Sequence, residues 1–263
     1  METETGDRFR NVLSRRYDVL ESVREESKAK AELVAELDQS RSTIDRAITE
    51  LLTIDCLEPT DSDRSRYRST PTGTVALQTY QEYCSDTDFV QRCAPVLNAL
   101  EPGTEISECF VSTAELHASS KTPDVALQPT IDLLEGATKL TGTAPVVFGE
   151  YFDILTEWME RGEAAMELVL EQELLESIVT NYSAEFTTLT GFGSVELYVY
   201  DGEIPYALWL IDREPTDHAG ITIYEQGGIK GSLVTDADPA VRWGRAQYDR
   251  LKAESTKLES HQS

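Results

Sequence analysis

The sequence is poor in the residues that build common metal and catalytic sites. Its 263 residues include three His and four Cys, and seven of its 23 basic residues are Lys. Cys56, Cys84, Cys93 and Cys109 form no CxxC pair, so zinc-finger spacing is absent and buried free thiols are the simpler interpretation. We therefore expect no metal site and no cofactor.

Long apolar runs are missing as well. There is no run of about 18 apolar residues, as a transmembrane helix would need. The stretch METETGDRFRNVLSRR has no apolar region typical of a signal peptide. We expect a cytoplasmic protein with no membrane partner. Hydrophobic residues still make up 40% of the chain, which is enough for a folded core.

Positive charge is scarce, and its distribution is uneven. Asp and Glu total 48 against 23 Lys and Arg, a formal net charge of −25. Dispersed carboxylates with little Lys are typical of a halophilic protein, and an ordinary acidic protein kept soluble by self-repulsion is the alternative. Residues 1–70 hold 12 basic and 16 acidic residues, a net charge of −4, so −21 falls on the other 193. This asymmetry predicts a relatively basic N-terminal module and a strongly acidic C-terminal one.

The most informative motif of the first module is AELVAELDQSRSTIDRAITELL. Apolar residues at 33, 34 and 37 predict a short helix, and DQS predicts a turn in which Ser40 caps the next helix. That helix carries one apolar stripe, made of Ile44, Ala47, Ile48 and Leu51. An earlier helix is expected over Phe9–Glu25.

A two-stranded wing is expected after this helix. Leu57 begins a short strand, TDSDRS forms a turn, and the second strand runs from Arg66 to Thr70. Because side chains alternate along a strand, Arg64, Arg66 and Arg68 are expected on one face. A further helix is expected over Gly73–Tyr83.

This order of helices and strands resembles a winged helix-turn-helix domain of archaeal and bacterial regulators. The segments SRSTIDRAITELLTIDCLEP and YRSTPTG carry the resemblance, which covers about residues 8–85. It implies double-stranded promoter or operator DNA as partner, read by the second helix of the motif and touched by the wing. The candidate DNA-binding residues are Ser40, Arg41, Ser42, Thr43, Arg46, Arg64, Arg66 and Arg68. The alternative is a protein-contacting module, which Asp45 and Glu50 on the same helix face would suit.

Strands and helices alternate in the acidic C-terminal part. The segments EYFDILTEWMERG and EQELLESIVTNYSAEF predict helices. Two hairpins are expected, VELYVY–DGEIP–YALWLI and AGITIYEQGGIKGSLVT, the second turning at Gly227-Gly228. Asp238 and Pro239 begin a last helix. The expected fold class is α+β or α/β, with a winged helix-turn-helix domain at residues 1–88, a linker at 89–104 and a mixed α/β effector domain at 105–263.

The C-terminal part resembles the effector domain of archaeal regulators related to the sugar-responsive TrmB family. PTIDLLEGATKLTG, DGEIPYALWLID and YEQGGIKGSLVTDADPAVRWGRAQYDRL carry this resemblance over about residues 95–255. Such domains look like the phospholipase D fold without its chemistry. The resemblance implies a transcriptional regulator controlled by a small-molecule effector such as a sugar, a sugar phosphate or a similar metabolite. Regulators that read palindromic operators are dimers, and Phe9–Glu25 and Gly73–Tyr83 are the expected interface helices.

No catalytic motif supports an enzyme. A phospholipase D-type site needs His-x-Lys, whereas HASSKTPD places Lys121 four residues after His117, and HExxH, GxSxG, GKS/T and GxGxxG are absent. We therefore expect no catalytic residue. Two alternatives stay open: a phospholipase D-like phosphodiesterase with a DNA-binding module, and a winged-helix adaptor of the transcription machinery.

Four residues are the candidates for effector binding. Arg213 and Lys230 are among the few basic groups of the acidic part and suit an anionic ligand. Tyr206 and Trp209 offer rings on which a sugar could stack. Core packing or surface solvation explains each of the four equally well.

Overall fold

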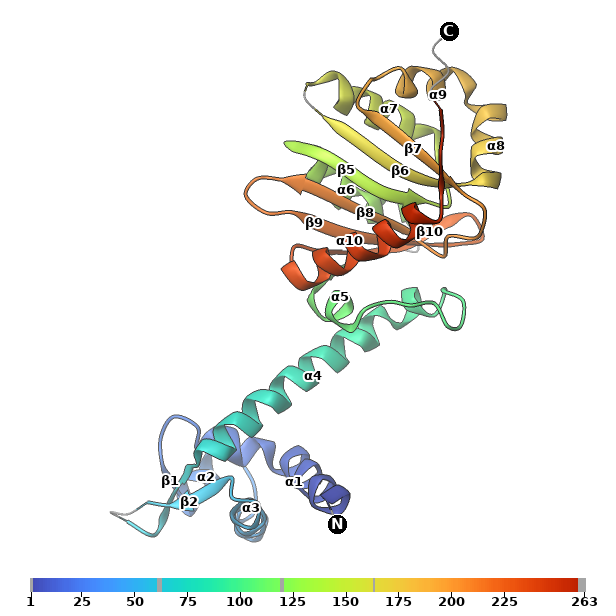
Figure 1. The fold of residues 1–263 in the computed structure, drawn as a ribbon. Helices are drawn as coiled ribbons and strands as arrows, with labels where there is room; N and C mark the ends of the chain where they lie inside the picture. The colour runs from blue at the N-terminus through green and yellow to red at the C-terminus, as the bar shows by residue number, and fades with distance from the viewer. Residues whose placement is uncertain (1, 61–62, 119–120, 163, 260–263) are drawn as a thin grey trace. The chain divides into compact units, whose positions relative to one another are not determined.

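The computed structural model describes residues 2–60, 63–118, 121–162 and 164–259 (Figure 1). The chain divides into two compact units, residues 1–88 and 89–263. The first is mainly helical with a small sheet, and the second combines helices with an eight-stranded sheet, so the expected fold class is confirmed. In the described part of the chain, no helix is both long enough and apolar enough to cross a bilayer.

The N-terminal unit has the element order of a winged helix. Its three strands are antiparallel in the order β1-β3-β2, so the expected wing is joined by a strand that the sequence did not suggest. Its elements are α1 (Glu2–Ser22), β1 (Lys28–Ala29), α2 (Lys30–Leu37), α3 (Arg41–Thr53), β2 (Leu57–Pro59), β3 (Arg66–Ser69) and α4 (Pro71–Leu97), which continues into the second unit.

The core of this unit forms around α3. The four residues of the expected apolar stripe, Ile44, Ala47, Ile48 and Leu51, are all at most 1% exposed, so the stripe is confirmed. They join Leu33 of α2 and several apolar residues of α1 in one cluster. Each buried side chain of this size contributes about 1.5–3 kcal/mol. The stripe therefore fixes which face of α3 points outward.

The start of α4 explains the motif YRSTPTG. Thr70 Oγ1 accepts a hydrogen bond from the Gly73 backbone N–H at 2.9 Å and donates one to the Asp55 carbonyl at 2.6 Å. Pro71 stands at the first helical position, where its missing N–H costs nothing. A Cβ on Gly73 would lie 2.1 Å from the Cys56 carbonyl oxygen, so this approach of α4 requires glycine.

Helix α4 is much longer than expected. It does not end at Tyr83 but runs to Leu97, and Pro95 lies inside it. Phe89, Cys93 and Val96 are buried in a core cluster of the C-terminal unit. The first part of the expected linker at 89–104 is therefore helix with a buried face, and the interpretation as a linker is wrong there.

The C-terminal unit is built on one mixed sheet with strand order β11-β7-β6-β5-β8-β9-β10-β4, in which β5, β6 and β7 are parallel. Its helical elements are α5 (Glu108–Thr113), the 3-10 helix η1 (Pro123–Leu127), α6 (Gln128–Leu134), α7 (Gly149–Glu160), α8 (Gln172–Asn181), α9 (Ser183–Thr190) and α10 (Asp238–Ala253). Its strands are β4 (Glu115–His117), β5 (Ala137–Ala144), β6 (Ala165–Glu171), β7 (Val195–Tyr200), β8 (Ala207–Arg213), β9 (His218–Glu225), β10 (Gly228–Thr235) and β11 (Thr256–Lys257).

The two faces of the sheet have separate cores. Along β8, Leu208 and Leu210 belong to the cluster that includes α5 and α10. The alternating residues Trp209 and Ile211 belong to the cluster that includes α7, α8 and α9. Figure 1 shows α10 lying along one face of this sheet. The unit is thus a sheet between two helical layers.

One expected hairpin is wrong and the other is confirmed. Strands β7 and β8 do not pair with each other, because β6 and β5 lie between them in the sheet. Strands β9 and β10 do form a hairpin, although its positive-φ residues are Gln226 and Gly227. The last helix begins at Asp238 as expected, whereas the helix expected over 171–186 is divided at Tyr182 into α8 and α9.

The four cysteines are free thiols. The expected burial is confirmed for Cys56 and Cys93 and is wrong for Cys84 and Cys109, which are partly exposed. Burial, with a smaller effect from Asp55, raises the pKa of the Cys56 thiol to about 11. A thiol of this kind stays protonated and packs as a small apolar group.

Candidate functional site

The N-terminal end of α3 is an exposed cluster of hydroxyl groups. Ser40 Oγ accepts a hydrogen bond from the Thr43 backbone N–H at 3.2 Å, which confirms Ser40 as the N-cap. The same oxygen lies 3.0 Å from Ser42 Oγ and 2.8 Å from Thr43 Oγ1. The first turn of a helix also carries unpaired N–H groups and a partial positive charge. This end of α3 therefore suits a phosphate or another hydrogen-bonding anion.

The acidic residues on the outer face of α3 are neutralised by neighbouring helices. Asp45 lies 2.6 Å from Lys30 Nζ, at the start of α2. Glu50 accepts a hydrogen bond from Arg16 Nε at 2.7 Å, and Arg15 lies 3.6 Å away. The Arg16 hydrogen bond, helped by the charge of Arg15, lowers the pKa of Glu50. The two carboxylates on this face, which would repel DNA if they were unpaired, are thus already paired with basic residues.

Arg41 and Arg46 differ from these paired groups. Both side chains are exposed on the face of α3 opposite the buried stripe. Among the residues that the structure describes, no carboxylate comes within ion-pairing distance of either guanidinium group. Both guanidinium groups are therefore available to an anion from outside the protein.

The wing arginines are placed differently from one another. Arg66 donates to the Ser27 carbonyl and lies 3.0 Å from Glu32, so it ties β3 to the start of α2. Arg68 donates to its cross-strand neighbour Glu58 at 2.8 Å. Arg64 is exposed but lies in the turn before β3. Arg64 thus lies in the turn that TDSDRS predicts, so alternation along β3 relates only Arg66 and Arg68, and Arg66 serves the fold.

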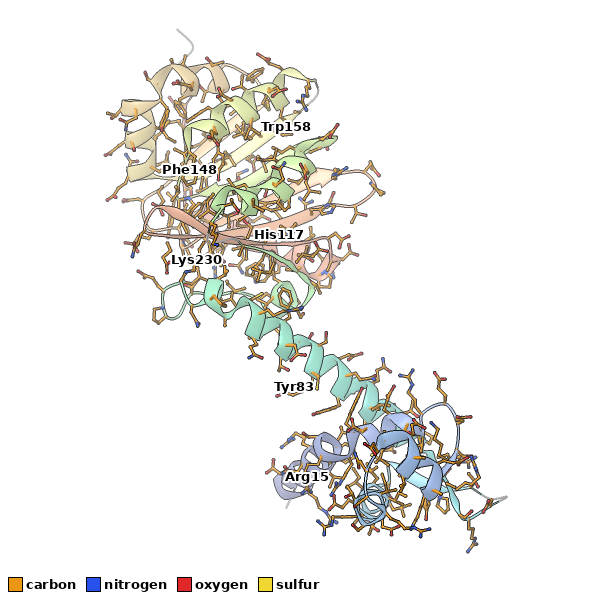
Figure 2. All side chains as sticks on the ribbon, turned by 180° about the vertical axis from the view of Figure 1, so that it is seen from behind. Arg15, Tyr83, His117, Phe148, Trp158 and Lys230 are labelled. Carbon is orange, nitrogen blue, oxygen red and sulfur yellow. The ribbon has the colours of Figure 1, made fainter. Side chains whose placement is uncertain are left out.

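The four candidate effector residues do not meet. Tyr206 donates to the Glu105 carbonyl at 3.0 Å and is buried in the α10-side core, whereas Trp209 is buried in the opposite core. The two rings therefore do not form one stacking surface. Lys230, labelled in Figure 2, pairs with Glu225 at 2.9 Å. This ion pair lies at the end of β9 that is joined to β10, next to the backbone pairing of Tyr224 with Ile229. Arg213 ends β8 beside the other end of β9, so the two cations are far apart in the sheet.

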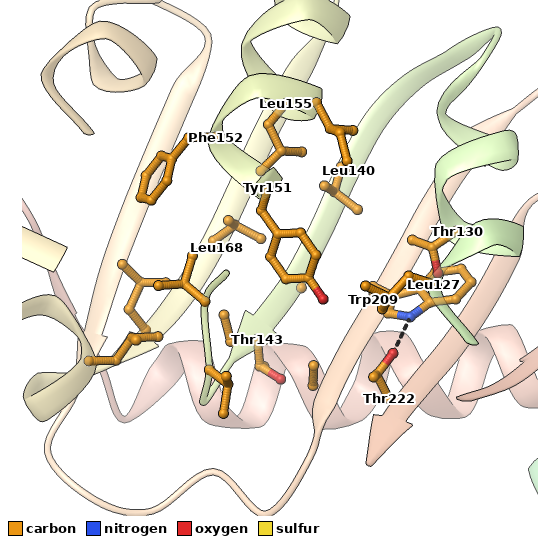
Figure 3. A pocket seen from close by; sticks show the side chains of 18 of the residues that line it. Leu127, Thr130, Leu140, Thr143, Tyr151, Phe152, Leu155, Leu168, Trp209 and Thr222 are labelled. Atoms are coloured by element: carbon orange, nitrogen blue, oxygen red, sulfur yellow. Dashed lines mark hydrogen bonds between the residues drawn. The ribbon is translucent and has the colours of Figure 1, made fainter. Parts of the chain in front are cut away.

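The C-terminal unit instead contains an apolar cavity of about 160 Å³ (Figure 3). It lies between the sheet and the helices α6, α7, α8 and α9. Trp209 lines it and is flanked by glycine on both neighbouring strands, Gly142 on β5 and Gly220 on β9. A Cβ on Gly220 would lie 1.8 Å from the indole ring, so glycine is what lets the ring lie flat there. The indole N–H donates to Thr222 Oγ1 at 3.4 Å.

Few polar atoms face this cavity, and two of them are unsatisfied. Thr143 Oγ1 is satisfied, since it accepts from the Leu208 N–H at 2.9 Å. Thr130 Oγ1 and Tyr151 Oη, by contrast, are buried and make no hydrogen bond of good geometry in the described part of the chain, although the Tyr224 hydroxyl, also at the cavity, interacts with Tyr151. Burial, with the neighbouring Tyr224 hydroxyl as a second cause, raises the pKa of Tyr151, so this phenol stays protonated and can donate. The cavity could not be predicted from the sequence, because it is lined by apolar core residues that come from many helices and strands.

The histidines show no catalytic arrangement in the described residues. His117 lies on the edge strand β4 and its Nε2 is 3.7 Å from Glu115. His218 begins β9, and its Nδ1 lies 3.0 Å from the Thr216 carbonyl. Where the chain is described, no three His, Cys, Asp or Glu residues come together as a metal site would require.

Comparison with solved structures finds distant similarities. The archaeal chromatin protein TrmBL2, whose structure is described as showing a novel mode of DNA binding, is 14% identical with a TM-score of 0.43, over 94% of each chain. The phospholipase D family member Nuc from Salmonella typhimurium is 11% identical with a TM-score of 0.43, over 56% of this chain and 99% of that one. NucT from Helicobacter pylori is 12% identical with a TM-score of 0.42, over 55% and 98%. Similarities at this level carry no argument about function, and a search of curated proteins gives no match.

Family models match both units. The HVO_A0261 N-terminal domain matches residues 6–92, which include α2, α3 and the wing. The middle domain of the methanogenesis regulatory protein FilR1 matches residues 123–254, from η1 to α10, and this is half of the chain. The chain therefore belongs to the family defined by the FilR1 middle domain.

Proposed function

We propose that this protein is a sequence-specific, DNA-binding transcriptional regulator. The N-terminal unit binds operator DNA through α3, and a small-molecule effector bound to the C-terminal unit controls it. The family model that matches residues 123–254 is named after a methanogenesis regulatory protein, which agrees with a regulatory role. The proposal assigns no reaction to the chain.

One observation carries the proposal, the state of the charges on α3. Asp45 and Glu50 are paired, while Arg41 and Arg46 are exposed and unpaired within the described residues. Arg pairs bidentately with guanine O6 and N7, and the hydroxyl groups at the helix start suit phosphates. Arg64, exposed in the turn before β3, adds positive charge from the wing.

The test is DNA binding by full-length protein. A duplex is first selected from a random library with the parent protein, and binding is then measured by fluorescence anisotropy over a range of salt concentrations. We expect Arg41→Ala together with Arg46→Ala to weaken binding to this duplex by about 2–6 kcal/mol, since each bidentate contact contributes about 1–3 kcal/mol. The slope of log K against log salt should also fall if either residue contacts phosphate.

The matched control removes two arginines from the other unit. Arg161→Ala together with Arg242→Ala makes the same change in net charge at exposed positions. This variant should keep the parent affinity. Equal loss in both double variants would show that net charge matters and α3 does not, which would contradict the proposal.

Homodimerisation is part of the proposal, and a groove on the N-terminal unit supports it. Residues of α1 and α4 line this groove, and Val75 and Tyr83 are 63% and 62% exposed beside it. Asp7 and Arg10 at the groove pair with each other within one chain, so apolar contact is what this surface offers to a second copy. We expect Val75→Glu with Tyr83→Glu to convert a dimer to a monomer in sedimentation velocity. A parent protein that is monomeric while bound to its selected duplex would contradict this part.

A further inference from the structure

The cavity under α6–α9 has the size and lining of a ligand site. A cavity of about 160 Å³ is large enough for one benzene-sized ring, because an apolar cavity of about 150 Å³ in another protein binds benzene. The described residues that line it include no charged side chain. A site of this kind binds through apolar contact, with a few polar groups that fix orientation.

The unsatisfied hydroxyl groups indicate what polar group the ligand carries. A buried hydroxyl without a partner is costly, and native proteins rarely keep two of them in one place. Thr130 Oγ1 comes from α6 and Tyr151 Oη from α7, so two separate helices each direct one hydroxyl at the same cavity (Figure 3). Tyr151 can donate, and Thr130 can donate or accept.

We propose that this cavity binds an uncharged, single-ring ligand with one hydroxyl or carbonyl oxygen, held by Thr130 and Tyr151. This inference rests on the proposed function, because it names the chemical class of the effector that the C-terminal unit binds. The oxygen meets the two hydroxyls while the ring packs against the apolar lining.

The lining also disfavours the sugar or sugar phosphate that the family resemblance implied. A sugar carries a hydroxyl on almost every carbon, and each needs a partner when buried. Of the other polar groups at the cavity, Thr143 and Thr222 already have protein partners, at 2.9 Å from the Leu208 N–H and 2.9 Å from Ser232 Oγ. The Tyr224 hydroxyl lies beside that of Tyr151. The basic candidates Arg213 and Lys230 do not line the cavity, so a phosphate would be buried without a counter-charge.

The test uses phenol and toluene as probes, with glucose 6-phosphate as the competing class. Binding to full-length protein is measured by ligand-observed NMR and by the rise in unfolding temperature. We expect phenol to bind one site per chain and more tightly than toluene, and glucose 6-phosphate not to bind at up to about 10 mM. Thr130→Val with Tyr151→Phe should weaken phenol binding by about tenfold and leave toluene binding unchanged, since both changes remove a hydroxyl and keep the shape.

Tyr248→Phe is the control, because its hydroxyl donates to Glu167 on the other face of the sheet. It should not change phenol affinity. Absence of phenol and toluene binding, equal phenol affinity in parent and hydroxyl-free variant, or binding of glucose 6-phosphate in place of phenol would each overturn the inference. DNA binding is measured without these probes, so its loss or survival is a separate result.

Discussion

The outer face of α3 and the cavity of the C-terminal unit differ in their charged residues: among the residues that the structure describes, the first presents unpaired arginines, and the second is lined by uncharged side chains. On α3 the acids are paired by Lys30 and Arg16, which leaves Arg41 and Arg46 available to an anion. The C-terminal unit lies in the part of the chain that holds −21 of the total charge of −25, yet the described lining of its cavity has no charged side chain. Net charge is therefore a poor guide to what each surface binds. Local pairing and burial decide it.

The largest effect is expected from a core substitution in the N-terminal unit, which tests whether the two units unfold independently. Leu51 is fully buried in the N-terminal core, so Leu51→Ala should lower the free energy of unfolding of that unit by about 2–5 kcal/mol. The three tryptophans, Trp158, Trp209 and Trp243, all lie in the C-terminal unit and report on it alone. Urea unfolding followed by far-UV circular dichroism should show an earlier loss of helix, while the midpoint by tryptophan fluorescence stays unchanged.

The matched control is Leu210→Ala, at a residue 1% exposed in the sheet of the C-terminal unit. It should lower the fluorescence midpoint. If Leu51→Ala moved the fluorescence midpoint as well, the units would unfold together and the separation would fail.

A smaller loss of stability is expected when a tyrosine hydroxyl of the C-terminal unit is removed, and two tyrosines can be compared. Tyr248 Oη donates to Glu167 at 2.9 Å, so Tyr248→Phe should cost about 1–3 kcal/mol. Tyr151 Oη makes no hydrogen bond of good geometry among the described residues and has only the Tyr224 hydroxyl beside it, so Tyr151→Phe should cost much less. Tryptophan-detected urea unfolding measures both. Equal destabilisation would show that the Tyr151 hydroxyl is satisfied and would remove a support of the ligand proposal.

The charge pairing on α3 predicts a modest effect on DNA affinity. Lys30→Ala should weaken binding of the selected duplex by about 0.5–1 kcal/mol at low salt, because Asp45 then faces the DNA unpaired. In an Asp45→Ala background the same change should have a much smaller effect. Fluorescence anisotropy titrations of the parent protein, the two single variants and the double variant complete this double-mutant cycle. An equal loss of affinity in both backgrounds would mean that Lys30 acts on the DNA directly.

The smallest effect is a pH dependence in the N-terminal unit. The pKa of Glu50 is lowered, mainly by Arg16, so its stabilisation is complete above the ordinary Glu pKa of about 4.5 and is lost as pH falls through the lower folded value. Glu50→Gln should therefore cost about 0.5 kcal/mol at pH 6, and this cost should shrink as the pH falls below the ordinary Glu pKa. Circular dichroism in urea at several pH values measures this. A cost that stays constant as the pH falls until the unit unfolds would mean that the contact does not depend on the charge of Glu50.

Local patterns in the sequence predicted the N-terminal unit well. The stripe from Ile44 to Leu51, the Ser40 cap and the two wing strands all depend on residues within a few positions of each other, and the structure confirms them. Non-local partners were not predictable in the same way. Nothing in the sequence indicated that Arg66 would reach Ser27, 39 residues away, and so belong to the fold.

The same limit explains the errors in the C-terminal unit. The turn residues between β7 and β8 suggested a hairpin, but strand pairing depends on the whole sheet, and β6 and β5 occupy the positions between them. Tyr206 and Trp209 looked like a pair because they are close in sequence, whereas their side chains lie in opposite cores. Thr130 and Tyr151 gave no signal, because a buried hydroxyl is recognised as unpaired only when its surroundings are known.

Hydrogen exchange of the full-length protein, followed by mass spectrometry, tests the division of roles between the units most directly. The selected duplex should slow exchange in residues 40–46, where the first turn of α3 has backbone N–H groups without helical partners. Phenol should slow exchange in the segments that carry Thr130 and Tyr151 and leave residues 40–46 unchanged. Protection of the C-terminal sheet by the duplex, with residues 40–46 exchanging as in the free protein, would contradict the account.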